Sequence, residues 1–554
     1  MVNIQLRDPN QVMTLSRLGS FHQSKLSFLR SFIREFKGWD FKKDLFDLDH
    51  DGYGTAIYSV RNKGRVYSLI CFANELDSSE RSDRVIATKW DTAFVLYDGI
   101  PTTEDIERLR INVPKQEIGR MSYKELTLSG ANKSVRIFDH VVESLSAGKQ
   151  PDTNIINEVG YLYRTTAVYG SGKFGLADRY RIKDRPEING PFRLEMMLVY
   201  LVREFTFDQV NHIAKARSPK TAVPLDNKIA RRLGIGNSTG LGMAPFIVNH
   251  PTLLHQWIFA REEALRQIRS IEKVTPNDFE IFKNCLHQSK YNIDTWKTES
   301  DYQNKKIASL KSDLQTFENT FLKNLNNNQE YLWNNLYQWI EANLSEEGIE
   351  YIVSMLMEPY DEIINPLVKE MSSDEDKYFD IPAEHTVDDL IELIKNNYKN
   401  MLGIDFNKKE SISHFWFISK NKEEPRVANR YEEEGSELEQ PLAIARDIVT
   451  LFERLSEAPS NQKISQFLIQ NDDLRHVVRR CNIVEKFPYA EIQDNTIGQN
   501  LIPIDMLRFK LSFFGAQKFD PRSDKWLRIC MYQGAPLMNE VNVSNDMWIY
   551  EGQA

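Results

Sequence analysis

The sequence predicts an α+β multidomain protein that is predominantly α-helical, with N-terminal and C-terminal α+β units around a helical middle. Three observations predict this class. The 554-residue chain is longer than one hydrophobic core can serve, so several domains are expected. Long stretches carry apolar residues at the three-and-four spacing of helices, and clusters of β-branched and aromatic residues lie toward both ends. Hydrophobic residues at 41% and charged residues at 27% exclude wholesale disorder.

The first expected domain covers residues 1–150 and combines a helix with a small sheet. Apolar residues between Phe21 and Phe36 line one broad helical stripe. Residues 54–76 and 84–99 are rich in β-branched and aromatic side chains, with Asn62 to Gly64 as a turn between two strands, and helical segments close the domain. The preceding DLDHDGY resembles half of a calcium loop. Because Tyr58 stands where a bidentate glutamate is required, an acidic turn into a strand is expected instead.

Three further parts follow along the chain. Residues 151–275 predict a helical domain with two glycine-rich loops, and residues 276–404 predict a helical region that is partly seam-forming. Residues 405–554 mix the strand-like HFWFISK and KWLRICMYQ with the helical PLAIARDIVTLFERL. The last part is therefore expected to be a second α+β domain.

The first glycine-rich loop, RTTAVYGSGKFGLADR, places glycines and a lysine between basic residues. Glycines let backbone N–H groups approach an anion, and the cations add charge and directed donors. The spacing fits neither a P-loop nor a dinucleotide fingerprint, and a flexible turn with solvated charges is the alternative. The residues assigned to ligand binding here are Arg164, Gly170, Ser171, Gly172 and Arg179, and those assigned to catalysis are Lys173 and Asp178.

The second loop, RRLGIGNSTGLGMAPF, is expected to open a helix that continues through Trp257. Four glycines within nine residues suggest close approach of the backbone to a ligand, and a helix start attracts anions. Tight packing against another helix is the alternative. The expected ligand-binding residues are Gly236, Asn237, Ser238, Thr239 and Gly240.

A helical segment between the two loops carries Arg193 and Glu195. Residues two apart face different sides of a helix, so these two cannot pair directly. We assign Arg193 to ligand binding and Glu195 to proton transfer, with solvated helix charges as the alternative for both. His250 and His255 lack the spacing of a zinc pair, and no metal site is predicted.

The composition restricts the cellular location and the binding partners that we expect for this protein. The net charge of −9 and the absence of a basic stripe disfavour nucleic acid as a partner. Four widely spaced cysteines, no signal-like N-terminus and no apolar run of about 18 residues favour a soluble cytoplasmic protein without a membrane span. The sequence is compatible with a monomer and with a homo-oligomer.

The sequence is compatible with two functions. The first is a soluble enzyme acting on a small anionic metabolite or a nucleotide-type cofactor held by the two loops, with the reaction class and the cofactor unknown. The second is a non-catalytic interaction or scaffold protein whose glycines serve helix packing. A scaffold should carry a contiguous exposed apolar patch on residues 276–400, whereas an enzyme should carry a polar-lined cavity.

Overall fold

The structure, a computed structural model, divides into two compact units that each draw on three stretches of the sequence. Unit 1 comprises Met1–Phe21, Gly240–Phe282 and Ala308–Phe509, and unit 2 comprises His22–Thr239, Lys283–Ile307 and Lys510–Ala554. The division into four consecutive domains, expected from the sequence, stays a prediction. The residues that the structure describes are 4–14, 16–77, 89–113, 121–165, 182, 184–240, 251–294, 296, 301–324, 329–371, 381–382, 384–405, 415–419, 425–428, 439–442, 444–492, 503–516 and 526–553.

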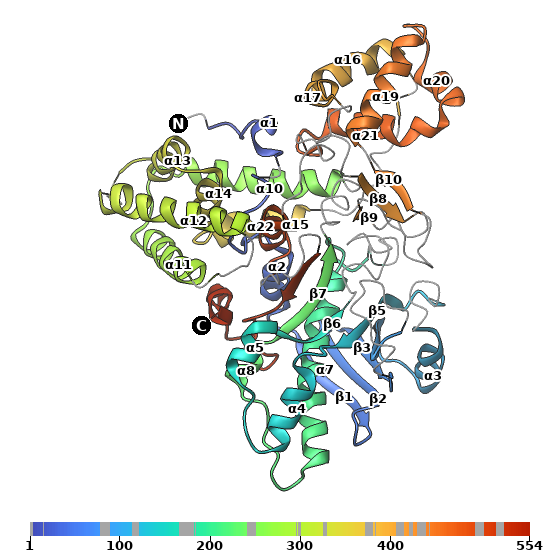
Figure 1. Ribbon diagram of the computed structural model, residues 1–554, viewed down its shortest axis with the longest axis vertical. Coiled ribbons are helices and arrows are strands. Elements are labelled where there is room, and N and C mark those ends of the chain that lie inside the picture. The colour runs from blue at the N-terminus through green and yellow to red at the C-terminus, as the bar shows by residue number, and fades with distance from the viewer. Residues whose placement is uncertain are drawn as a thin grey trace. The chain divides into compact units, whose positions relative to one another are not determined.

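Unit 2 is built on a mixed eight-stranded sheet with the strand order β1-β2-β3-β4-β5-β6-β7-β11 (Figure 1). Neighbours from β1 to β6 pair antiparallel, whereas β6 and β7 pair parallel. The strands are β1 (Asp40–Leu48), β2 (Gly54–Asn62), β3 (Arg65–Ala73), β4 (Thr92–Asp98), β5 (Glu125–Lys133), β6 (Tyr161–Thr165), β7 (Gly234–Gly240) and β11 (Trp526–Met531).

The turns at the start of this sheet match the sequence expectations. Asn62 to Gly64 lie at the turn between the antiparallel strands β2 and β3. The acidic turn before β2 is held by the Asp49 carboxylate, which accepts hydrogen bonds from the backbone N–H groups of Asp51 and Tyr53, each at 2.9 Å. An Asp side chain that closes its own turn in this way needs no calcium ion.

Three strands lie where helix or loop was expected. Residues 161–165 form β6 because Gly160 takes a left-handed conformation, with φ of 77°, and ends helix α5 (Thr153–Val159) one residue earlier. Residues 125–133 form β5, although helical segments were expected to close the N-terminal part. Residues 234–240 form β7, so the prediction of a second glycine-rich loop that begins there was wrong.

The glycines of β7 are explained by the neighbouring strands. A side chain at Gly234 would overlap the carbonyl oxygen of Met531, and a Cβ at Gly236 would lie 2.7 Å from the ring of Tyr161. Glycine in a strand interior commonly marks such a close approach. Tight packing, the alternative considered for this segment, therefore accounts for both glycines, although the partners are strands.

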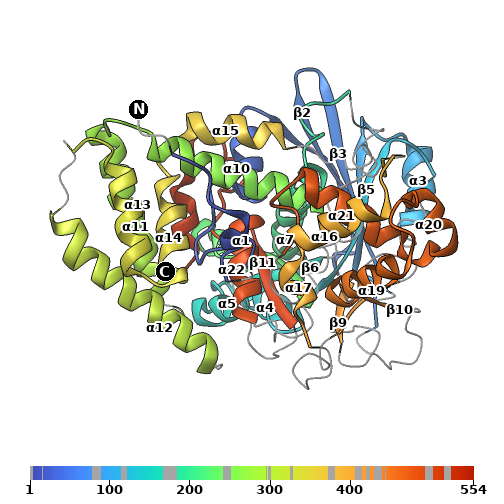
Figure 2. The same ribbon diagram turned by 90° about the horizontal axis from the view of Figure 1, so that it is seen from above.

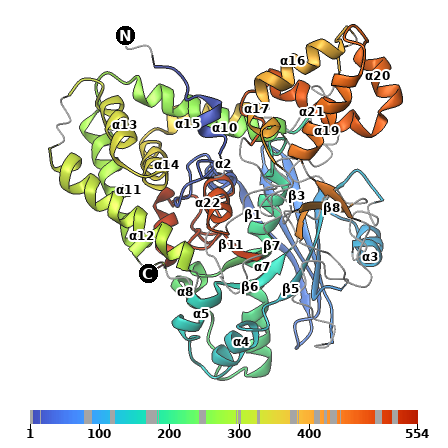
Figure 3. The ribbon, with the colours of Figure 1, turned by 45° about the horizontal axis from the view of Figure 1, so that its top comes forward.

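Helices cover the sheet on both faces. Phe205 of α7 packs against Phe94 and Tyr163, with ring centroids 5.8 and 6.4 Å away. Leu109 of α3 belongs to a buried cluster with Val95 and other residues of the opposite face. Figure 3 shows α3 and α7 flanking these strands. The helices of unit 2 are α2 (Phe28–Phe36), α3 (Thr103–Asn112), α4 (Phe138–Ser146), α5, α7 (Arg193–Arg217), α8 (Asn227–Arg231) and the 3-10 helix η7 (Asp546–Gln553).

Unit 1 is mainly helical, as expected for residues 276–400. Helix α10 contacts α13, α14, α15 and α21, and α16, α19 and α21 contact one another (Figure 2). Its helices are α1 (Pro9–Val12), α10 (Pro251–Arg269), α13 (Leu332–Asn343), α14 (Glu346–Leu356), α15 (Asp361–Glu370), α16 (Val387–Asn397), α17 (Lys399–Leu402), α19 (Ile444–Glu457), α20 (Ile464–Gln470) and α21 (Arg475–Lys486), with shorter turns η3 (Phe317–Phe321), η4 (Leu322–Asn324) and η6 (Asp472–Leu474).

The remaining elements confirm several expectations for the C-terminal part. The segments HFWFISK and KWLRICMYQ contain β8 and β11, and PLAIARDIVTLFERL contains most of α19, although its first two residues belong to β10. Strands β8 (Phe415–Ser419), β9 (Pro425–Ala428) and β10 (Glu439–Leu442) form a three-stranded antiparallel sheet. Helices α11 (Pro276–Asp294), α12 (Asp301–Thr316) and α22 (Pro503–Phe513) contribute residues to both units. Within the described part of the chain, no helix has the length and hydropathy needed to cross a membrane.

Candidate functional site

The parallel pair β6 and β7 gives unit 2 a distinctive sheet edge. Tyr163 pairs with Ile235 and Arg164 with Gly236, so the two strands run side by side in the same direction. Both therefore end toward the same edge, which we call the carboxyl edge. In open sheets with parallel strands, ligands bind outside the carboxyl ends of the strands. The carboxyl edge of β6 and β7 is therefore the candidate ligand site of unit 2.

Four polar side chains form a row across β5, β6 and β7 near this edge. Side chains alternate along a strand, and Tyr163 and Phe94 define the face that contacts α7. Ser129 pairs with Phe94, and Thr165 follows Tyr163 by two residues, so both share that face. By the same alternation, Thr127 and Asn237 also belong to it. We call Thr127, Ser129, Thr165 and Asn237 the polar row.

Helix α7 contacts β5 and β6, two of the strands that carry the polar row. The Arg203 side chain donates to the Leu233 carbonyl at 2.8 Å, and the Tyr163 hydroxyl donates to Gln209 at 3.0 Å. Leu233 directly precedes β7, and Tyr163 precedes Thr165 on β6. Each member of the row is buried, with 1 to 3% of its surface exposed.

Hydrogen bonds satisfy only the middle of the polar row. The hydroxyl oxygens of Ser129 and Thr165 lie 2.8 Å apart, and Thr165 also donates to the Gly130 carbonyl at 3.3 Å. The Thr127 hydroxyl and both polar atoms of the Asn237 side-chain amide have no hydrogen-bond partner in the structure as described. Buried polar groups in native proteins are usually paired, so these three atoms require an explanation.

The sequence-predicted residues fall into three groups. Arg164 and Gly236 are neighbours on β6 and β7, and alternation places the Arg164 side chain on the face opposite to the polar row. Ser238, Thr239 and Gly240 continue β7 after Asn237. The positions that lie outside the described residues are Gly170, Ser171, Gly172, Lys173, Asp178 and Arg179.

Arg193 and Glu195 begin helix α7, and both are buried. The Arg193 guanidinium donates to the Glu35 carboxylate at 2.5 Å. Burial lowers the pKa of Arg193 below its ordinary value, and the Glu35 charge offsets that effect only in part. Solvated helix charges, the alternative for this pair, are wrong because neither side chain is exposed to solvent.

A second titratable group on α7 is Glu204. Burial raises the pKa of Glu204 to about 7, and one carboxylate oxygen accepts a hydrogen bond from the Met538 N–H at 3.1 Å. One turn further along α7, Asp208 accepts from the Tyr58 hydroxyl at 2.8 Å and lies 2.6 Å from the Lys43 ammonium. Glu204 therefore exchanges a proton near neutral pH, which is a property of catalytic acids and bases and also of structural carboxylates.

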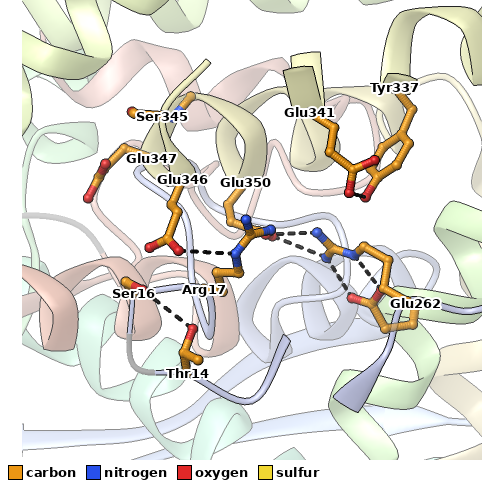
Figure 4. A network of polar contacts seen from close by, with 12 residues as sticks. Thr14, Ser16, Arg17, Glu262, Tyr337, Glu341, Ser345, Glu346, Glu347 and Glu350 are labelled. Atoms are coloured by element: carbon orange, nitrogen blue, oxygen red, sulfur yellow. Dashed lines mark hydrogen bonds and ion pairs between the residues drawn. The ribbon is translucent and has the colours of Figure 1, made fainter. Parts of the chain in front are cut away.

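Unit 1 buries a different kind of polar cluster, an ion network of arginines and glutamates (Figure 4). Arg7 bonds the Glu262 carboxylate at 2.7 Å through two nitrogens and the Glu350 carboxylate at 2.8 Å. Arg261 lies 3.2 Å from Glu262 and 3.7 Å from Glu350, and Arg17 lies 3.6 Å from Glu350. The network joins the N-terminal segment to α10 and α14.

The ion network holds the Glu350 carboxylate in the charged form. Burial acts to raise the pKa of Glu350, but the charges of Arg7 and Arg261 outweigh it, so the pKa lies below its ordinary value. A carboxylate that is both buried and paired is a poor proton carrier at neutral pH. We therefore interpret the ion network as a structural contact that stabilises the packing of the N-terminal segment against α10 and α14.

Sequence reasoning missed the ion network and, apart from Asn237, the polar row, for different reasons. Thr127 and Ser129 alternate with Leu126 and Leu128, which is the period of a strand with one polar face, so that signal was present. The ion network joins residues up to 343 positions apart in the sequence. Nothing in the local sequence of Arg7 indicates such partners.

Comparisons with known proteins identify no relative. No protein-family model matches the chain, and no curated protein or solved structure matches it. Within the described residues, no group of three or more His, Cys, Asp or Glu side chains is arranged to hold a metal ion.

Proposed function

We propose that unit 2 binds a small anionic metabolite or a nucleotide-type cofactor at the carboxyl edge of β6 and β7, and that the protein is an enzyme acting on it. The observation that carries the proposal is the parallel pairing of β6 with β7. Because the two strands are neighbours with one direction, β6 and β7 both end toward this one edge.

The amino-acid sequence around these two strands supports an anionic ligand. In sequence, β6 is followed by GSGKFG and two further cations, and β7 itself contains three glycines. Glycine-rich chain lets backbone N–H groups approach an anion, and lysine and arginine supply charge. In this proposal Lys173 and Arg179 hold the charge of the ligand, together with Arg164 at the end of β6.

Proton transfer is assigned to Glu195 or Asp178. Glu195 lies in the first turn of α7 and is 1% exposed, so a ligand that reached it would meet a carboxylate shielded from water. Shielding from water strengthens electrostatic interactions and tunes the carboxylate for acid or base chemistry. The reaction class is left open by this proposal.

The scaffold alternative receives less support. It requires a contiguous exposed apolar patch on residues 276–400. In the described part of that region, Tyr291 is the one large apolar residue that is exposed to solvent, with 57% of its surface accessible. One exposed tyrosine is ordinary for a protein surface.

We also propose a cytoplasmic location. All four cysteines, Cys71, Cys285, Cys481 and Cys530, are buried free thiols. Free thiols are typical of a reducing compartment.

A thermal-shift screen tests the proposed function. The purified chain is mixed with inorganic phosphate, pyrophosphate, small carboxylates and nucleotides, because a ligand that binds only the folded state raises Tm. We expect at least one anion to raise Tm in the wild type and to lose most of this effect in Lys173→Ala and Arg164→Ala. Lys149→Ala, at an exposed turn after α4, is the control and should respond as the wild type does. A screen without any anion-dependent shift would overturn the proposal.

A further inference from the structure

Residues 532–545 of unit 2 form an irregular segment, which we call the strap, that lies across helix α7. The Arg203 guanidinium donates to the carbonyl oxygens of Ala535 and Pro536, each at 3.0 Å, and the Tyr200 hydroxyl donates to the Pro536 carbonyl at 2.8 Å. The strap, all of which lies in the described part of the chain, contains no helix or strand between β11 and η7. Segments of this kind open more easily than the strands and helices of a core.

A carboxyl group of α7 lies directly against the strap. Glu204 accepts a hydrogen bond from the backbone N–H of Met538 at 3.1 Å. The neighbouring Arg203 directs its guanidinium to carbonyl oxygens instead of to Glu204. A charged Glu204 would therefore be met by one N–H group, and a buried carboxylate without an ion pair costs free energy.

The other charged groups around Glu204 are already paired. On α7, Asp208 lies 2.6 Å from the Lys43 ammonium of β1. On the strap, Glu540 lies 2.9 Å from Arg231 at the end of α8. Each of these cations has a carboxylate of its own, so burial is the largest influence on Glu204 and raises its pKa to about 7.

We propose that the strap is a pH-sensitive closure, which stays on α7 while Glu204 is neutral and opens as Glu204 becomes charged. A neutral carboxyl group still accepts from the Met538 N–H through its carbonyl oxygen, so protonation keeps the contact. A charged carboxylate is stabilised by water, which it reaches when the strap opens. The closure is independent of the proposed ligand, because the strap bonds the backbone of Arg231, which precedes β7, and not the carboxyl edge.

The direction of the pH dependence follows from the two states of the strap. With the strap open, Glu204 reaches water and takes its ordinary pKa of 4.5, whereas closure raises this pKa to about 7. The closed strap binds the proton more tightly, so its stabilisation is fully present below about pH 4.5 and is lost as the pH rises through about 7. For these two pKa values, the equilibrium constant for opening should increase about tenfold between about pH 6 and pH 8.

Hydrogen exchange with mass spectrometry of the full chain tests the proposal. Peptides covering residues 532–545 report the opening of the strap at about pH 6 and pH 8, after correction for the intrinsic effect of pH on amide exchange. We expect an increase of about tenfold in the wild type. In Glu204→Gln, which keeps an acceptor for the Met538 N–H but cannot titrate, the increase should stay below about twofold.

Glu540→Gln is the matched control, because it changes a carboxylate of the strap itself. The pKa of Glu540 lies below its ordinary value: hydrogen bonds from Arg231 and the Leu537 N–H outweigh burial, so Glu540 stays charged across this pH range. Loss of the ion pair with Arg231 should increase opening at both pH values and leave the ratio between them at about tenfold.

Three results would overturn the proposal. The first is a wild-type strap whose opening does not change with pH, whether or not the variants fold. The second is an equal increase in the wild type and Glu204→Gln, since another group would then carry the titration. The third is equal protection of the strap and of peptides from β3, since the strap would then open only when the whole of unit 2 unfolds.

Discussion

Arg7 of unit 1 and Asn237 of unit 2 are both almost fully buried, at 6% and 1% exposure. Only the side chain of Arg7 forms hydrogen bonds with other side chains. Two carboxylates meet its guanidinium at 2.7 and 2.8 Å. Neither polar atom of the Asn237 amide is hydrogen-bonded in the described structure. The difference teaches that a buried polar group stabilises a fold only when its partners come from the fold itself.

The same kind of substitution should therefore act oppositely at the two positions. Removing one member of a buried ion network leaves uncompensated charges in the interior. Removing an unpartnered amide deletes a group that costs free energy where it stands.

The largest effect is expected at the ion network. Arg7→Met leaves Glu262 and Glu350 without their closest cation, and such a break typically costs about 3 to 5 kcal/mol. Hydrogen exchange with mass spectrometry at increasing urea measures the free energy of unfolding from peptides of unit 1 alone. Arg454→Met is the control. Its side chain is 41% exposed and pairs with Asp473 at 3.0 Å, so its loss should cost less than about 1 kcal/mol.

The second effect is a pH dependence carried by Glu204. Its pKa is raised from 4.5 in the unfolded chain to about 7, so the folded state binds the proton more tightly. This stabilisation is fully present below about pH 4.5 and is lost as the pH rises through about 7. Glu204→Gln keeps an acceptor for the Met538 N–H but cannot titrate.

Between pH 5 and 8, wild-type unit 2 should lose on the order of 2 kcal/mol relative to Glu204→Gln, because one pKa unit corresponds to about 1.4 kcal/mol. Urea unfolding of both proteins at several pH values checks this. Parallel curves for the two proteins across that range would show that Glu204 does not carry the effect.

A smaller effect of opposite sign is expected at Asn237. Asn237→Leu replaces an unpartnered amide by an apolar group of similar size and should raise the free energy of unfolding of unit 2 by about 1 kcal/mol.

The smallest effects are expected within the rest of the polar row. Thr165→Val breaks the hydroxyl pair with Ser129 and should cost about 1 kcal/mol, whereas Thr127→Val removes an unpartnered hydroxyl and should change stability by less than about 0.5 kcal/mol. Both substitutions conserve side-chain shape. Equal losses at the two positions, measured by urea unfolding, would mean that Thr127 has a partner after all.

Much of the fold could be predicted because its signals are local. The helices of residues 276–400, the hairpin of β2 and β3, and the segments containing β8, α19 and β11 follow from periodicity and residue type. The strands β6 and β7 could not be predicted in this way. Their pairing depends on contacts such as Gly236 against Tyr161, which join residues 75 positions apart in sequence.

The candidate site was predicted in part. Asn237 was named from its glycine-rich surroundings, although it lies on a strand and not in a loop. Thr127 was missed because β5 was not expected, and its alternation with Leu126 and Leu128 becomes meaningful only once the sheet is known. The ion network of Arg7 could not be predicted from the sequence, because only the tertiary structure brings Glu262 and Glu350 to the Arg7 side chain.

One measurement tests the contrast between the two units most directly. The free energies of unfolding of Arg7→Met and Asn237→Leu are measured in a single series of hydrogen exchange against urea, each read from peptides of its own unit. The account predicts a loss of about 3 to 5 kcal/mol for Arg7→Met and a gain of about 1 kcal/mol for Asn237→Leu. A loss of more than about 1 kcal/mol for Asn237→Leu would show that the fold itself satisfies this amide, and would contradict the account.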